Sequence, residues 1–103
     1  MRIKILTSAV DDLSNGFNFY ESQSKGLGSY FLESLFAEID SLKLNAGIHL
    51  QVFGYYRLLS KHFPYAVYYK INSKTIYINA ILDCRREPGN IKKRLENLGV
   101  IDE

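Results

Sequence analysis

The first half of the chain repeats its apolar residues every three to four positions, as amphipathic helices do. A short strand is predicted at Arg2–Leu6, before this pattern begins. A first helical set follows and consists of Val10, Leu13, Phe17 and Tyr20. Glycines at positions 26 and 28 interrupt the chain, and from there a second set runs through Leu27, Phe31, Leu35, Ile39 and Leu42. So short a connection predicts an antiparallel pair of helices.

Beyond Gly47 the apolar residues alternate with polar ones, which is typical of strands. Strands are predicted at 55–63, 65–71 and 75–82, with Pro64 between the first two and a tight turn at 72–74. The strand at 75–82 is the most apolar and is expected inside the sheet. One face of the strand at 65–71 should carry Tyr65, Val67, Tyr69 and Ile71.

A last helix is predicted to begin at Pro88 and to end at Gly99. Its apolar stripe is made of Ile91, Leu95 and Leu98. We expect the stripe to pack on the chain's own sheet; the alternative is a groove in which an amphipathic segment of a partner binds. The order of elements predicts one α+β domain over residues 1–103. In it a helical hairpin packs on a mainly antiparallel four-stranded sheet, and a helix follows at the C-terminus.

Composition places the chain among folded intracellular proteins. Hydrophobic residues make up 47% and charged residues 23%, as in ordinary globular domains. A single cysteine forms no internal disulfide, and no apolar stretch approaches the roughly 20 residues of a membrane helix. The N-terminus does not resemble a secretion signal. We therefore expect a cytoplasmic protein that does not bind membranes.

Charge is unevenly distributed along the chain. Residues 1–51 hold four Lys and Arg against six Asp and Glu, a net charge of −2. Residues 52–103 hold nine against five, a net charge of +4. Such an excess suits nucleic acid or an acidic protein segment, although mixed charge also simply keeps a small domain soluble.

The basic half contains the groups that metal-independent RNA cleavage requires. That reaction needs an acid, a base and cations beside the phosphate. The catalytic candidates for such a nuclease are Arg57, Lys61, His62, Arg85 and Arg86. Tyr65, Arg85, Arg86, Lys92 and Lys93 are the candidates for binding an anionic partner. The two histidines and one cysteine have no metal-ligand spacing, so neither a metal nor a cofactor is expected.

Each candidate also has a structural interpretation. Arg57 and Lys61, four apart on a predicted strand, would share a face and could simply protect a sheet edge. His62 could be an ordinary turn residue. Arg85 and Arg86 could form salt bridges with Asp83, Glu87 or an N-terminal acid. The sequence does not choose between these two arginines.

Three stretches carry a resemblance to a known family: GLG before the second helix, RLLSKHFPYAVYYKI at 57–71 and INAILDCRREP at 78–88. With this order of elements the chain resembles the RelE/ParE superfamily of toxins, most of all its ParE-like, plasmid-stabilisation branch. The resemblance implies the toxin of a type II toxin–antitoxin module, neutralised by a cognate antitoxin. RelE-like members cut mRNA on the ribosome without metal, whereas ParE-like members poison DNA gyrase.

The resemblance also bears on the target. RelE-type nucleases typically carry an arginine in a Gly-Tyr-Arg context, and here the corresponding stretch reads Phe63-Pro64-Tyr65. The family's C-terminal arginine has counterparts in Arg85 or Arg86. Gyrase is therefore the leading expected target. A ribosome-dependent endoribonuclease is the alternative, and a non-toxic member that retains only protein binding is the third interpretation. The oligomeric state stays open.

Overall fold

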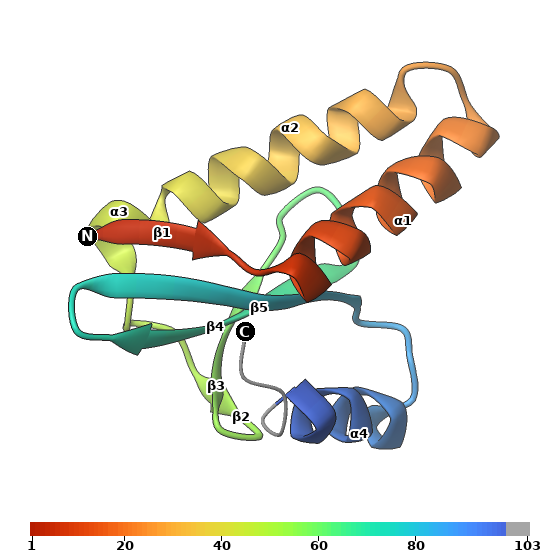
Figure 1. Cartoon of the computed structure of the whole chain (residues 1–103). Helices are drawn as coiled ribbons and strands as arrows, with labels where there is room; N and C mark the ends of the chain where they lie inside the picture. Colours follow the sequence, from red (N-terminus) through yellow and green to blue (C-terminus); the bar gives the residue numbers. More distant parts are fainter. Residues whose placement is uncertain (99–103) are drawn as a thin grey trace.

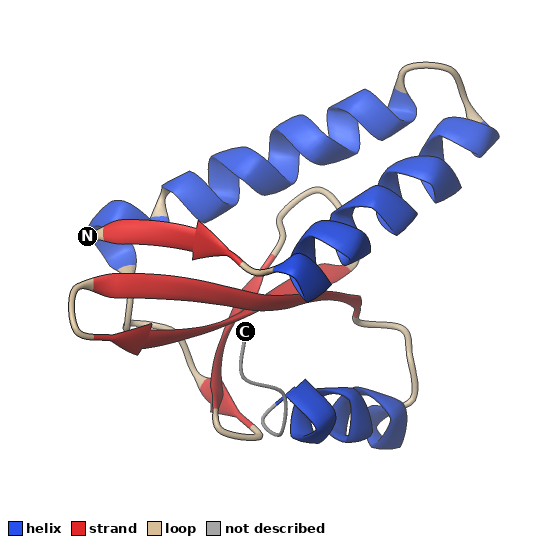
Figure 2. Ribbon diagram, in the orientation of Figure 1, coloured by secondary structure: helices blue, strands red, loops and turns tan. Residues whose placement is uncertain are grey.

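The computed structural model describes residues 1–98, which form a five-stranded sheet with helices on both faces (Figure 1). The strands are β1 (Arg2–Ile5), β2 (Gln51–Val52), β3 (Tyr55–Leu59), β4 (Tyr65–Asn72) and β5 (Thr75–Asp83). The helices are α1 (Thr7–Gln23), α2 (Leu27–Asp40), α3 (Leu42–Asn45) and α4 (Pro88–Leu98). Figure 2 shows α1 and α2 on one side of the sheet and α4 on the other. The helix end predicted at Gly99 lies outside the described residues.

The strands lie in the order β1-β5-β4-β3-β2, with β1 parallel to β5 and every other pair antiparallel. The expected α+β class and mainly antiparallel sheet are confirmed, but the count of four strands is one short. The missed strand, β2, has two residues and therefore no alternation to read. Phe53 and Gly54 join it to β3 with φ of 53° and 85°, as a two-residue hairpin of this hand requires. β5 is paired on both sides, as expected, although the middle strand is β4.

β3 ends at Leu59, so the strand predicted through residue 63 is wrong in its second half. Residues 60–64 form a loop closed by a hydrogen bond from Ser60 N–H to the Tyr65 carbonyl at 2.9 Å. Within this loop, Lys61 N–H donates to Glu38 Oε2 on α2 at 2.7 Å. The loop therefore satisfies its backbone partly through a helix side chain.

The helices α1 and α2 form the predicted antiparallel hairpin and approach each other closely at Gly28. A Cβ on Gly28 would lie 2.7 Å from the Phe17 carbonyl oxygen, a distance that only glycine permits. Across the turn, the Glu21 carboxylate on α1 accepts the N–H groups of Gly26 and Gly28 at the start of α2. One prediction for this hairpin is wrong: Val10 is 49% exposed and lies outside the core.

A bulge in β5 decides which residues face which helices. The β4–β5 register skips Asn79. Before the bulge Ile78 packs under the helical hairpin, and after it Ile81 does so. Ala80 and Leu82 belong to the second core cluster, on the α4 side. The single extra residue therefore turns Ile81 toward the hairpin and Ala80 and Leu82 toward α4, the reverse of what a regular alternation from Ile78 would give.

The predicted stripe of α4 packs on the chain's own sheet. Ile91 and Leu95 are buried and Leu98 is partly buried against the same cluster. The Tyr55 hydroxyl donates to the Leu95 carbonyl at 3.0 Å and so joins β3 to the helix. On β4 the predicted face is also confirmed, because Tyr65, Val67, Tyr69 and Ile71 all contribute to the hairpin core. No helix within residues 1–98 is long and apolar enough to span a membrane.

Candidate functional site

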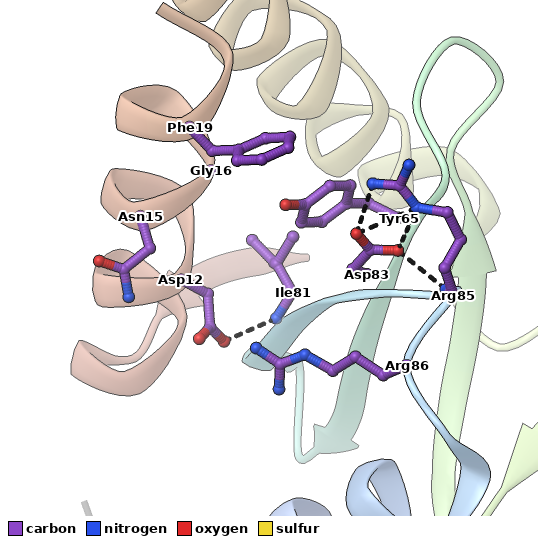
Figure 3. Close-up of a pocket in the computed structure, with 9 residues that line it drawn as sticks. All are labelled: Asp12, Asn15, Gly16, Phe19, Tyr65, Ile81, Asp83, Arg85 and Arg86. Atoms are coloured by element: carbon purple, nitrogen blue, oxygen red, sulfur yellow. Dashed lines mark hydrogen bonds and ion pairs between the residues drawn. The ribbon is translucent and has the colours of Figure 1, made fainter. Parts of the chain in front are cut away.

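A cavity of about 380 Å³ lies between α1 and the end of β5 (Figure 3). We call it the α1 cavity. It is lined by Asp12, Asn15, Gly16, Phe19, Tyr65, Ile81, Asp83, Arg85 and Arg86. Three of the residues predicted to bind an anionic partner, Tyr65, Arg85 and Arg86, therefore meet at one place. They do so because β4 begins where β5 ends, which sets Tyr65 opposite Asp83 in the register.

Asp12 forms the buried wall of the α1 cavity. Its carboxylate accepts the Ile81 N–H at 2.9 Å and two hydrogen bonds from the Arg94 guanidinium at 3.0 and 2.9 Å. Burial raises the pKa of this carboxyl, while the bonds from Arg94 and Ile81 act in the opposite direction. Arg94 lies on α4 and was not among the candidate site residues. Its pairing with Asp12, 82 positions earlier in the sequence, produces no local sequence pattern.

The first turns of α1 cover the edge of β5 that β1 leaves open. Leu6 N–H donates to the Ile78 carbonyl at 3.0 Å, and the Ser8 hydroxyl donates to the Asn79 carbonyl at 2.7 Å. Asp12 then accepts from Ile81, as described above. Ser8 lies within α1, and its side chain binds the sheet and does not cap the helix. The edge is thus closed by a helix and is not available for pairing.

Arg85 is already paired at the mouth of the cavity. Its guanidinium donates to both Asp83 oxygens, with the shortest contact at 2.6 Å, and its backbone N–H donates to Asp83 Oδ1 at 2.8 Å. These bonds hold the pKa of Asp83 below its usual value and raise the pKa of Arg85. The predicted salt bridge is confirmed for this arginine. Because the Arg85 side chain is 60% exposed, the pair contributes little to stability.

Arg86 differs from its neighbour. Within residues 1–98 it takes part in no ion pair, and its side chain extends into the cavity toward Asp12 (Figure 3). The two carboxylates of the cavity are each satisfied by another arginine, Asp12 by Arg94 and Asp83 by Arg85. The charge of Arg86 is therefore the one left to act on a ligand.

Tyr65 supplies a neutral donor beside these arginines. Its ring packs edge-on against Phe31 with centroids 5.0 Å apart, which fixes its orientation. Burial raises the pKa of the Tyr65 hydroxyl, so the group stays protonated at neutral pH. A protonated phenol and a guanidinium together suit an anionic group such as phosphate or carboxylate.

Lys61 and His62 lie elsewhere, in the loop after β3. They line a second cavity, of about 420 Å³, which we call the α2 cavity. Its lining consists of Tyr30, Glu33, Ser34, Ala37, Glu38, Ser41, Leu58, Leu59, Lys61 and His62. The predicted shared face of Arg57 and Lys61 is wrong, because Lys61 is not in the strand.

Arg57 lies on β3, opposite Tyr68 of β4, and its charge acts to lower the pKa of Tyr68 and of Cys84, against the larger effect of burial. Its Nε atom is buried and has no hydrogen-bond partner within the described chain. Tyr68 belongs to the core on the α4 side, so Arg57 and Tyr65 lie on opposite faces of the sheet. Cys84 is exposed, and desolvation raises the pKa of its thiol, which disfavours a nucleophilic role.

Lys92 and Lys93 are exposed on α4, on the side away from its buried stripe. They are available to a partner but lie outside the α1 cavity. Over residues 1–98 there is no group of three or more His, Cys, Asp or Glu side chains that could hold a metal ion.

Comparison with solved structures identifies the fold. The chain is similar to a chain of the chromosomal ParDE toxin–antitoxin (TA) system from P. aeruginosa. The TM-score is 0.65 at 20% sequence identity, over 79% of this chain and 92% of that chain. No family model matches the sequence, and no curated protein matches it. The chain therefore has a ParE-like fold, as its sequence resemblance implied.

Proposed function

We propose that the chain is the toxin of a type II toxin–antitoxin module and that a cognate antitoxin binds and neutralises it. The observation that carries this proposal is the fold shared with a chain of a ParDE system. The sequence stretches 57–71 and 78–88 also support it, because they resemble those of the RelE/ParE superfamily.

Within this proposal the α1 cavity receives an anionic group of the target. Arg86 contributes the charge, Tyr65 the neutral donor, and Asn15 a side-chain amide at the cavity wall. Arg85 is held by Asp83 and serves mainly to shape the entrance. Of the two adjacent arginines, Arg86 is thus the one assigned to binding.

DNA gyrase is the target that we favour. The candidates for RNA cleavage are spread over three places: Arg85 and Arg86 at the α1 cavity, Lys61 and His62 at the α2 cavity, and Arg57 on the opposite face. A general acid and base must lie within hydrogen-bond reach of one phosphate. The observed separation weighs against a ribonuclease that uses this set.

The test is induced expression of the chain alone in a bacterial host, with early and separate measurements of translation and DNA integrity. We expect growth arrest with filamentation and DNA damage, while early translation continues. Co-expression of an acidic reading frame adjacent to the gene should restore growth. The same experiment with Arg86→Met should reduce toxicity more strongly than the matched Lys93→Met.

Two results would change the assignment. A rapid stop of translation with cleaved mRNA would replace the gyrase proposal with a ribonuclease. Normal growth in the presence of well-folded protein would leave a member that only binds its partner.

A further inference from the structure

The α2 cavity contains the carboxylate of Glu38, of which only one oxygen accepts a hydrogen bond in the described chain. Glu38 Oε2 accepts the Lys61 N–H, but Glu38 Oε1 is buried and has no hydrogen-bond partner within residues 1–98. Leaving a buried acceptor unpaired is costly, and such a group calls for an explanation. Ser34, at 9% exposure, places a second buried polar side chain on the wall of the same cavity.

The other walls suit a flat cation on an aliphatic stem. The rings of Tyr30 and His62 lie side by side with centroids 5.9 Å apart, and Tyr30 is 46% exposed. Leu59, at the rim, is 53% exposed. Aromatic faces attract guanidinium groups, and apolar rims pack against the methylene stems of long basic side chains.

The charge of the surrounding surface favours the same ligand. Helix α2 carries Glu33, Glu38 and Asp40 and contains no lysine or arginine. Lys61 and His62 are the basic residues that line the cavity, and Lys61 contributes its backbone N–H to Glu38 while forming no ion pair with it in the described chain. A cationic ligand in this cavity would therefore lie beside an acidic helix, although the second half of the chain is basic.

We infer that the α2 cavity binds an arginine side chain presented by a partner protein, with the guanidinium stacking on Tyr30 and donating to Glu38 Oε1 once the side chains that cover this oxygen move aside. Arginine fits better than lysine because its planar group donates in several directions and stacks on a ring at the same time. That the partner is the antitoxin rests on the proposed function. The binding of an arginine side chain does not depend on it.

The test uses the isotope-labelled chain and amide NMR titrations with N-acetyl-arginine amide. N-acetyl-citrulline amide, a neutral compound of nearly the same shape, is the matched ligand. We expect the arginine derivative to shift the amide signals of Tyr30, Glu38 and Lys61, and the citrulline derivative to leave them unchanged. Glu38→Gln should weaken the arginine response about tenfold, since it removes the charge from the hydrogen bond.

Asp40→Asn is the matched control variant, because it removes one negative charge from the same helix outside the cavity. Its response should equal that of the unmodified chain. Glu38→Gln retains an oxygen to accept the Lys61 N–H, so its spectrum should otherwise stay native. The inference is overturned if both ligands act alike, if the shifts map to another surface, or if Asp40→Asn weakens binding as much as Glu38→Gln. None of these results bears on whether the chain is toxic.

Discussion

Asp12 on α1 and Arg94 on α4 form a two-bonded ion pair beside the edge of the sheet that separates their helices. The Asp12 side chain is 8% exposed and that of Arg94 is 28% exposed. The same carboxylate binds Ile81 of β5. One acid thus connects the hairpin, the sheet and the last helix, at the wall of the cavity that we assign to target binding.

Removing Arg94 should therefore cost far more stability than removing a surface charge. Arg94→Met leaves Asp12 buried and without its partner, for which we expect a loss of about 3 kcal/mol in the free energy of unfolding. Urea denaturation measures this loss. Lys93→Met, one position away on the exposed side, should change stability by less than about 0.5 kcal/mol. Equal losses in the two variants would show that the pair does not hold α4 to α1.

The pKa values of the two acids of the α1 cavity should be shifted in opposite directions from that of an ordinary aspartate, which is about 3.9. Arg85 lowers the pKa of Asp83, so the ionised Asp83 stabilises the fold at a pH above the ordinary aspartate pKa. This stabilisation is lost as the pH falls through the folded-state pKa of Asp83. The pKa of Asp12 is raised by burial, so its effect favours the fold at low pH and is lost as the pH rises through the folded-state pKa.

Side-chain carboxyl NMR titration measures both groups in one sample. We expect Asp83 to lose its proton at a lower pH than Asp12. Arg85→Gln should raise the pKa of Asp83 toward the ordinary value and leave that of Asp12 nearly unchanged. The reverse order of titration would be inconsistent with the pairings described above.

Gly28 should be essential to the close approach of α1 and α2. Alanine normally stabilises a helix relative to glycine, but here the added Cβ meets the Phe17 backbone oxygen, which has no freedom to move aside. We expect Gly28→Ala to destabilise the chain by about 1–3 kcal/mol, measured by thermal unfolding. Gly89→Ala in α4 meets nothing within 4 Å and should change stability by less than about 1 kcal/mol. If Gly28→Ala leaves the stability of the chain unchanged, the two helices of the hairpin separate easily.

His49 should make the stability of the fold dependent on pH. The Tyr69 hydroxyl accepts the Gly47 N–H at 3.0 Å and is also hydrogen-bonded to His49 Nδ1. Burial lowers the pKa of His49. As the pH falls below about 6.5, the unfolded chain takes up a proton more readily than the folded chain, and stability decreases. Urea midpoints at several pH values should show a smaller decrease for His49→Gln; identical slopes would rule out this contribution.

Local patterns were sufficient for most of the fold. Alternation identified the buried face of β4, and helical spacing identified the stripe of α4. The strand β2 is too short to produce a pattern, and the bulge at Asn79 reverses an alternation that reads as regular in the sequence. The predicted extent of β3 was too long because the Lys61 N–H binds Glu38, which is a contact between distant segments.

In the candidate site, too, local sequence patterns predicted some residues, while contacts between distant segments determined others. Tyr65, Arg85 and Arg86 were found from residue type and position, and they do line one cavity. Asp12 was missed because an acid in the first turns of a helix ordinarily interacts with the helix dipole in solvent. Its burial depends on Arg94 and Ile81, which lie 82 and 69 positions away, and neither separation has a sequence signature.

Incubation of the purified chain with DNA gyrase, supercoiled plasmid and ATP tests the central claim most directly. The proposal predicts that linear, gyrase-cleaved DNA accumulates in proportion to the added chain, and that Arg86→Met forms less of it than Lys93→Met does. Unaffected gyrase at a large excess of folded chain, together with cleavage of ribosome-bound mRNA, would contradict the proposal.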